Sequence, residues 1–149
     1  MKHNWFQTTI AYEKMAEEGI IVKVRENYLI DALSFTEAEA RITEQMTPYI
    51  QGEFTVAKAT RARISEMFFN DNGSKWFRGK VNFIMFDEEK GVEKKMAATM
   101  MVQADDIQGA LDGIIAGMKG SLTDYEIWSV TTTDIEAVIK YDDEEEEKE

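Results

Sequence analysis

Apolar and polar residues alternate over two stretches near the start of the chain. In residues 5–12 one side carries Phe6, Ile10 and Tyr12, and in residues 20–30 Ile, Val and Tyr alternate with Lys23 and Arg25. A period of two residues is typical of a strand with one buried face. Residues 16–19 supply a turn between the stretches, so we expect a hairpin of two strands.

A helix is predicted after this hairpin. Ser34 with Glu37 three residues later forms a capping box, and Pro48 limits the helix at its other end. The apolar residues of the segment fall on one stripe: Phe35, Ala38, Ile42 and Met46. We expect this stripe to cover one face of the sheet.

The second half of the chain repeats the pattern at an offset of 71 or 72 residues. Trp5 and Phe6 match Trp76 and Phe77, and the apolar helix positions match in the same order. Asp105 with Gln108 takes the capping role in the second copy. Each copy ends in a long β-rich segment, residues 53–69 and 125–141, which is too long for a typical strand and is expected to bend or to contain a bulge.

These patterns predict an α+β fold made of two tandem strand-strand-helix-strand repeats, with mostly antiparallel sheet and two helices packed on one side. Residues 1–69 form the first repeat, residues 70–75 a linker and residues 76–141 the second repeat, together one compact domain. Residues 142–149 read DDEEEEKE and are expected to be a disordered acidic tail, either solubilising or interacting. They carry −6 of the formal net charge of −12, which leaves −6 for residues 1–141.

Composition excludes several kinds of chemistry. The 149 residues contain no Cys and one His, His3, close to the N-terminus, so disulfides, thiolate nucleophiles and histidine metal sites are not expected. No phosphate-binding or nucleophile-elbow motif occurs. No apolar run reaches the roughly 18 residues that span a bilayer, and no secretory signal is evident, so we expect a cytoplasmic protein. We expect no catalytic residue, metal or cofactor, and a carboxylate-based enzyme ranks third among the hypotheses.

The sheet face opposite the helices is predicted to combine cations with aromatic rings. The period of two places Trp5 and Trp76 there, together with Lys23, Arg25, Arg61, Arg63, Arg78, Lys80 and Lys95. Cations follow a phosphate backbone and exposed rings stack bases, so this face suits single-stranded nucleic acid. The alternative is that the two tryptophans cover a second core or a dimer interface, and the acidic net charge argues against tight binding.

Three glycines recur every four residues on the second predicted helix: Gly109, Gly113 and Gly117. Interior glycines destabilise a helix, so three on one face indicate that another backbone approaches closely. The neighbour is either the sheet of the same chain or the same helix of a second protomer in a homodimer.

Four segments resemble an uncharacterised domain family of Bacteroidales bacteria and their phages: WFQTTIAYEK, YLIDALSFTEAEARITEQM, GEFTVAKATRARISEMFF and KWFRGKVNFIMFDEEKGVEKK. The resemblance extends to about Tyr141 and implies no activity and no catalytic residue. It implies a setting of small phage or mobile-element proteins, in which replication accessories and inhibitors of host defence are both common.

The leading hypothesis is a non-enzymatic protein that binds single-stranded DNA as a replication accessory, with a tail that competes for the basic face or recruits a protein partner. The alternative is a homo-oligomeric phage protein that sequesters a host defence protein or a nucleotide signal, with the glycine face at the protomer contact. Salt dependence distinguishes the two, because phosphate binding weakens steeply as salt is added.

Overall fold

The computed structural model describes residues 4–141, which form two compact units. Within these residues, unit 1 consists of 4–63 and 134–141, and unit 2 consists of 64–133. Each unit has one α-helix and a four-stranded sheet in which antiparallel pairs predominate, and unit 1 also has a short 3-10 helix, Glu17–Gly19, between its first two strands. The predicted α+β class is confirmed. No helix among residues 4–141 has the length and apolar character needed to cross a membrane.

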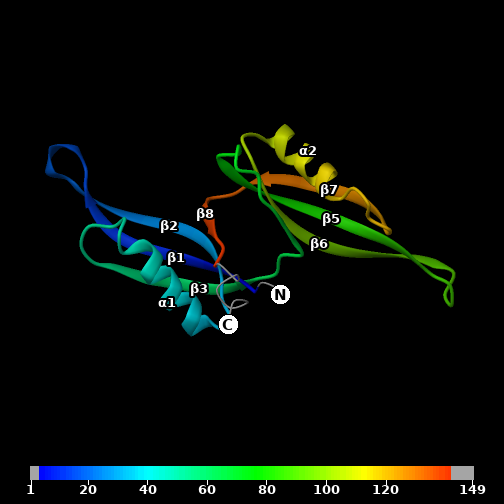
Figure 1. Ribbon diagram of the computed structural model, residues 1–149, viewed down its shortest axis with the longest axis horizontal. Coiled ribbons are helices and arrows are strands. Elements are labelled where there is room, and N and C mark those ends of the chain that lie inside the picture. Colours follow the sequence, from blue (N-terminus) through cyan, green and yellow to red (C-terminus); the bar gives the residue numbers. More distant parts are fainter. Residues whose placement is uncertain (1–3, 142–149) are drawn as a thin grey trace, which may run out of the picture. The chain divides into compact units, whose positions relative to one another are not determined.

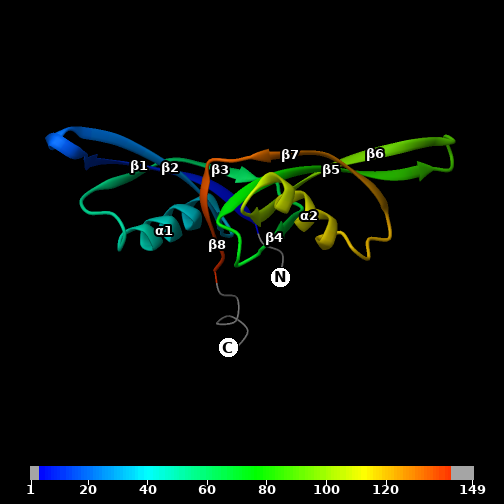
Figure 2. The same ribbon diagram turned by 90° about the horizontal axis from the view of Figure 1, so that it is seen from above.

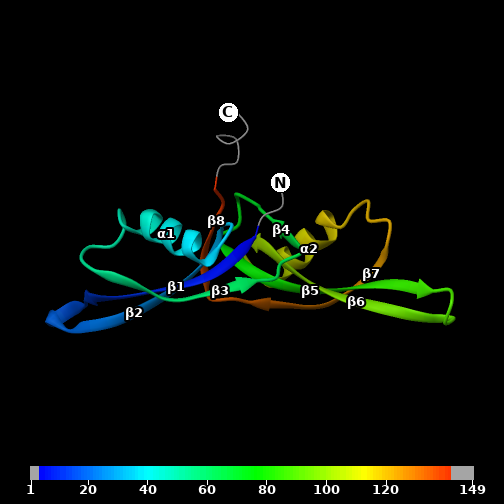
Figure 3. The ribbon, with the colours of Figure 1, turned by 90° about the horizontal axis from the view of Figure 1, so that it is seen from below.

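The sheet of unit 1 has the strand order β3-β1-β2-β8 (Figure 1). Its strands are β1 (Trp5–Met15), β2 (Ile21–Asp31), β3 (Phe54–Ala62) and β8 (Ile135–Ile139). β1 pairs antiparallel with β2 and β3, whereas β8 lies parallel to β2. The helix α1 (Phe35–Met46) lies on one face of this sheet (Figure 3). The opposite face carries no helix of unit 1, and we call it the helix-free face of that unit.

The sheet of unit 2 has the order β4-β6-β5-β7. Its strands are β4 (Glu66–Phe68), β5 (Lys75–Asp87), β6 (Val92–Ala104) and β7 (Asp124–Thr132), and α2 (Ile107–Gly117) covers one face. β5 pairs antiparallel with β6 and β7, and β4 lies parallel to β6. The β5–β6 hairpin continues well past α2 (Figure 2). The face without α2 is the helix-free face of unit 2.

The internal repeat is visible in the topology, but its last strand is exchanged between units. The two sheets have the same strand order when the second is read from its other edge, as β7-β5-β6-β4. In this order β7 corresponds to β3, β5 to β1, β6 to β2 and β4 to β8. Yet β4, encoded by the first repeat, pairs with β6, and β8, encoded by the second, pairs with β2. Each compact unit is therefore one repeat without its last strand, completed by the last strand of the other repeat.

The exchange accounts for the two unusually long β-rich segments. Each of them is divided into two strands that belong to different sheets, at residues 63–65 and 133–134. The predicted irregularity is present as well, because the register shifts opposite Thr9 and Ile10 in one sheet and opposite Lys80 and Val81 in the other. Residues 70–75, predicted as a linker between repeats, connect β4 to β5 inside unit 2.

An equivalent hydrogen bond follows the end of each exchanged strand. The backbone N–H of Tyr141 donates to Asp31 Oδ1 at 2.8 Å, and that of Asn70 donates to Gln103 Oε1 at 3.0 Å. Asp31 and Gln103 lie 72 residues apart, as expected for equivalent positions of the repeat. The start of the described chain lies beside the same acceptor, since the Ala32 N–H donates to the carbonyl of Asn4 at 3.0 Å.

Local capping signals explain where the helices begin. Ser34 Oγ accepts the N–H of Glu37 at 3.1 Å, as the capping box predicts. In the second helix the cap is Asp106, which accepts the N–H of Gly109 at 2.7 Å, so the prediction of Asp105 was wrong by one residue. Asp105 accepts instead from the N–H of Ser74 at 2.9 Å, which ties the loop before β5 to the start of α2.

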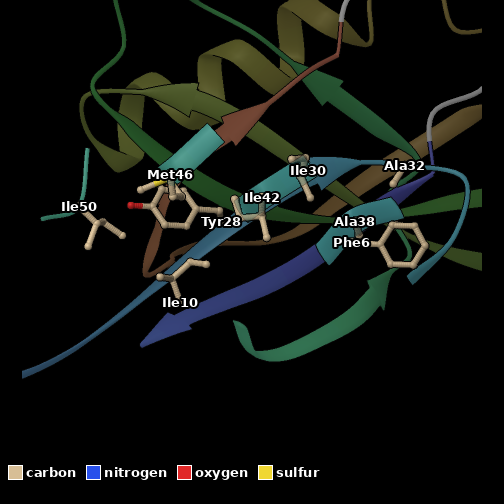
Figure 4. Packing of buried hydrophobic residues seen from close by; sticks show 9 residues of the cluster. All are labelled: Phe6, Ile10, Tyr28, Ile30, Ala32, Ala38, Ile42, Met46 and Ile50. Atoms are coloured by element: carbon tan, nitrogen blue, oxygen red, sulfur yellow. The ribbon is translucent and has the colours of Figure 1, made fainter. Parts of the chain in front are cut away.

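Each helix encloses a core against its own sheet. In unit 1 the core consists of Phe6, Ile10, Tyr28, Ile30, Ala32, Ala38, Ile42, Met46 and Ile50 (Figure 4). In unit 2 it consists of Phe77, Val81, Met100, Val102, Ala104, Ala110, Ile114 and Met118. Burial of these apolar side chains is the main favourable term that holds each helix on its sheet.

Candidate nucleic-acid interface

The two tryptophans predicted as stacking platforms are buried. Trp5 is 5% exposed and Trp76 is 6% exposed, so neither presents a ring face on which a base could stack. Trp76 instead makes an edge contact with Phe69, with 5.4 Å between the ring centroids. This corrects the sequence-based assignment of both residues.

The error has a physical cause. A period of two residues separates the faces of a strand but does not show which face meets solvent. Near Trp5 and Trp76 both faces are buried, because Leu29 is as buried as its neighbour Ile30, and Met101 is as buried as Val102. The alternative considered from the sequence, that the tryptophans belong to a covered face, matches their burial.

The helix-free face of unit 1 carries three exposed cations. Lys23 and Arg25 on β2 are exposed, as predicted, and lie opposite Glu13 and Ala11 of β1. The cross-strand register adds Lys58 of β3, which faces Thr9.

Two arginines assigned to this face from the sequence do not lie on it. Arg61 lies opposite the core residue Phe6, so it shares the face that α1 covers, and its guanidinium donates to Asn4 Oδ1 at 2.8 Å. Arg63 follows the end of β3 and is exposed in the segment that leads to β4. The register shift in β3 and the end of the strand break the alternation from which both were placed.

The helix-free face of unit 2 carries the other predicted cations. Lys80 on β5 is exposed, whereas Arg78 is half-buried opposite Met101. Lys95 on β6 is exposed, and its Nζ lies 2.9 Å from Glu126 Oε1 of β7. Since β5 lies between β6 and β7, this ion pair spans the middle strand of the sheet.

Trp128 is an exposed aromatic residue on this face that sequence reasoning missed. Its side chain is 68% exposed, and its Nε1–H donates to the same Glu126 Oε1 at 3.0 Å. It is the extra residue where β7 shifts register opposite Lys80 and Val81. The signal available in the sequence is the alternation of Tyr125 and Ile127, two partly buried residues that pack against the core. Trp128 directly follows Ile127, so it falls outside their face.

Asn82 on β5 lies opposite Glu126 in the register of β5 and β7. We call Lys80, Asn82, Lys95, Glu126 and Trp128 the Trp128 cluster. The hydrogen bond from Lys95 lowers the pKa of Glu126, with a further contribution from Trp128, and the same contact raises the pKa of Lys95. The Glu126 carboxylate and the Lys95 ammonium group therefore both remain charged at neutral pH. The shared carboxylate holds the indole N–H close to the Lys95 ammonium group and leaves the ring accessible. Lys80 lies opposite Ser129, the residue that follows Trp128.

The three glycines of α2 face the sheet of their own unit. A Cβ atom on Gly113 would lie 2.9 Å from Val102 Cγ2, and one on Gly117 would collide with the ring of Phe68. A Cβ on Gly109 would lie 3.1 Å from Asp106 Oδ1. Close packing on β6 and β4 accounts for the glycines, which corrects their assignment to a protomer contact.

The tips of both long hairpins expose large apolar side chains. Met15, Ile20 and Ile21 are exposed in unit 1, and Phe86 and Val92 are exposed in unit 2. These residues lie at the ends of their strands, next to the turns.

Two of the sequence-based predictions fall on residues that are not described. His3 and the acidic segment 142–149 lie outside residues 4–141. Within residues 4–141, no group of three His, Cys, Asp or Glu side chains is arranged to hold a metal ion.

Comparison with known proteins places the chain in a family. No curated protein and no solved structure matches it. The model of a family described as "Domain of unknown function (DUF4494)" matches residues 4–141, which are all the residues that the structure describes. The chain therefore belongs to the DUF4494 family.

Proposed function

We propose that this protein binds single-stranded nucleic acid without catalysing a reaction, through the helix-free faces of its two units. The observation that carries the proposal is Trp128, an exposed ring whose N–H shares the Glu126 carboxylate oxygen with Lys95. The exposed Lys80 lies on the neighbouring strand, opposite Ser129. Aromatic rings stack bases of any sequence, and nearby ammonium groups attract the phosphates. In unit 1, Lys23, Arg25 and Lys58 offer further phosphate contacts.

The biological role we propose is that of a replication accessory of a phage or mobile element, acting on single-stranded DNA in the cytoplasm. The acidic segment 142–149 competes with nucleic acid for the cationic faces, because a tethered polyanion has a high effective concentration. It also offers a binding segment for a protein partner.

The test is a fluorescence-anisotropy titration of a labelled single-stranded oligonucleotide at low and moderate salt. We expect affinity to fall with added salt and to rise in a chain that ends at Tyr141. Trp128→Ala should weaken binding about 5- to 150-fold, which corresponds to about 1–3 kcal/mol of lost stacking. Leu122→Ala is the matched control, because Leu122 is a fully exposed apolar residue of the same unit, outside the Trp128 cluster.

The intrinsic fluorescence of the protein gives an independent readout. Of the three tryptophans, Trp5 and Trp76 are buried, so quenching by a bound oligonucleotide should come from Trp128 and should be lost in Trp128→Phe. If the chain ending at Tyr141 binds no oligonucleotide at low salt, the proposal is wrong.

The exposed hairpin tips favour a second candidate, a homo-oligomeric phage protein that sequesters a host defence protein or a nucleotide signal. Apolar residues such as Ile21 and Phe86 suit contacts between protomers better than the glycines of α2. Light scattering on the wild type and on Ile21→Lys/Phe86→Lys tests this function. If the second candidate is right, the wild type forms an oligomer and the double variant is monomeric. The protein should then have no affinity for oligonucleotides at any salt concentration.

A further inference from the structure

A pocket of about 430 Å³ opens in unit 1 between the sheet and the end of α1. This volume falls in the range of sites for small molecules. Its lining comes from β1, β2, α1, the turn after α1 and β8: Tyr12, Glu26, Tyr28, Gln45, Met46, Tyr49, Ile50, Ala137 and Ile139. Three of these residues, Tyr28, Met46 and Ile50, are drawn in Figure 4 toward the side of the core away from Phe6.

Among the described residues, Glu26 is the one charged residue of the lining, which otherwise consists of apolar and aromatic residues and Gln45. It lies opposite Ile10 in the β1–β2 register, so it occupies a position on the core face of β2. The Tyr28 hydroxyl donates to Glu26 Oε1 over 3.3 Å. Burial raises the pKa of both Tyr12 and Tyr28, and interaction with Glu26 raises it further, so both phenols remain protonated at neutral pH.

The electrostatics of the pocket favour a cation. None of the lining residues is basic. Glu136, on β8, adds to the negative potential felt by both phenols. A phosphate-bearing ligand would be repelled, whereas an ammonium group gains from a partly buried carboxylate and from the faces of neighbouring rings.

We propose that this pocket binds a small organic cation, an ammonium group attached to an aromatic or alkyl body. The ammonium donates to the Glu26 carboxylate, and the body lies against Met46, Ile50 and Ile139. This site lies on the helix-covered side of unit 1 and does not depend on the proposed binding of nucleic acid at the helix-free faces.

The experiment is a titration of the full chain with three probes of similar shape: phenethylammonium, neutral 2-phenylethanol and phenylacetate. Calorimetry gives the affinity, and amide chemical shifts locate the site. We expect saturable binding of phenethylammonium with shifts at Tyr49 and Ala137, and at least about tenfold weaker binding of the other two probes.

Two variants test the charge of the site. Glu26→Gln keeps the shape of the side chain and should weaken phenethylammonium binding about tenfold or more. Glu39→Gln removes the same charge from an exposed position on α1 that does not line the pocket, and should leave binding unchanged. If Glu26→Gln fails to fold, Gln45→Lys places an ammonium group on the pocket wall and should produce the same loss.

Each result of these titrations either supports or overturns the proposal. Selective, Glu26-dependent binding of phenethylammonium with shifts in the pocket supports the proposal. No saturable binding of phenethylammonium up to its solubility limit overturns it. Equal binding of the neutral probe, or binding that Glu26→Gln and Gln45→Lys leave unchanged, also overturns it, because the carboxylate would then not select the ligand.

Discussion

Gly73 lies where the loop after β4 passes close to the backbone of β6. A Cβ atom at this position would come within 2.6 Å of the Ala104 nitrogen and 2.7 Å of its Cα. Backbone atoms cannot rotate away as the end of a flexible side chain can, so the loop itself would have to move. Glycine is needed at position 73 because the loop backbone lies too close to the backbone of Ala104 for any side chain to fit.

Gly73→Ala should therefore destabilise the protein by about 1–3 kcal/mol. Urea unfolding followed by circular dichroism measures the change. Asn72→Ala is the matched control, since Asn72 is exposed and only its backbone N–H makes a hydrogen bond, to Asn70 Oδ1 at 3.2 Å. The control should change the free energy of unfolding by less than about 0.5 kcal/mol. Equal stability of the two variants would contradict the role of close packing.

Glu126 has two opposing effects on the proposed nucleic-acid interface. Its carboxylate orients Trp128, but it also neutralises Lys95. Glu126→Gln keeps an oxygen that can accept from the indole and removes the negative charge. We expect oligonucleotide affinity to rise, with a steeper salt dependence because Lys95 becomes free to bind a phosphate.

The control for this prediction is Glu66→Gln in β4, which removes one negative charge from the same unit outside the Trp128 cluster. If both substitutions raise the affinity equally, the effect comes from net charge and not from the release of Lys95. Anisotropy titrations of both variants at two salt concentrations provide the measurement.

Residue by residue, sequence reasoning succeeded where the signal is local. The exposed positions of Lys23, Arg25, Lys80 and Lys95 agree with the alternation along their strands. The prediction that Trp5 is exposed was wrong, because alternation along a strand does not reveal that both faces of the sheet are covered there. Glu26 was also missed, although a charged residue within an apolar alternation is the kind of break that marks a polar group in a core.

At the scale of elements, the exchanged strands depend on an acceptor at the end of their partner. Asp31→Ala removes the acceptor of the Tyr141 N–H and should destabilise unit 1 by about 1–3 kcal/mol, because a partly buried hydrogen bond and the ion pair between Asp31 and Arg41 are lost. Asp31→Asn retains an oxygen and should cost less. Hydrogen exchange of the β8 amides measures the effect directly.

The equivalent change in the other copy is the natural comparison. Gln103→Ala removes the acceptor of the Asn70 N–H and should speed exchange in β4 and leave β8 unchanged. Each substitution is thus expected to loosen a strand that the other repeat encodes. Faster exchange in the strand of the same repeat would contradict the observed pairing.

The elements differ in how far the sequence predicts them. The bounds of α1 follow from a capping box, an apolar stripe and a proline, all of which act within a few residues. The partners of β4 and β8 depend on contacts with distant parts of the chain. Residues 53–69 and 125–141 carry the composition of strands, but composition alone cannot show that each segment serves two sheets.

For the whole molecule, the exchange makes each repeat incomplete without the other. Pieces 1–72 and 73–149 each lack one edge strand of their unit and carry a strand that the other piece needs. We expect the pieces to purify together when coexpressed and to recover the circular dichroism of the intact chain. Either piece alone should be much less stable, because its parallel edge strand is missing.

The experiment compares coexpressed pieces with each piece produced separately. Urea unfolding of the separate pieces gives their stability, and a tag on one piece reports capture of the other. If both pieces fold alone with the stability of the intact chain, the exchanged strands contribute little and the prediction fails.

The acceptor at the end of β2 also brings the two ends of the described chain together. Asn4 binds the backbone of Ala32, and Tyr141 binds the side chain of the adjacent Asp31. A circular permutant that joins residue 141 to residue 4 by a short linker and begins at Gly73 should therefore keep every strand pair. In the gene for this permutant the second repeat would precede the first. We expect the same fold, so the order of the two repeats along the chain would not determine the structure.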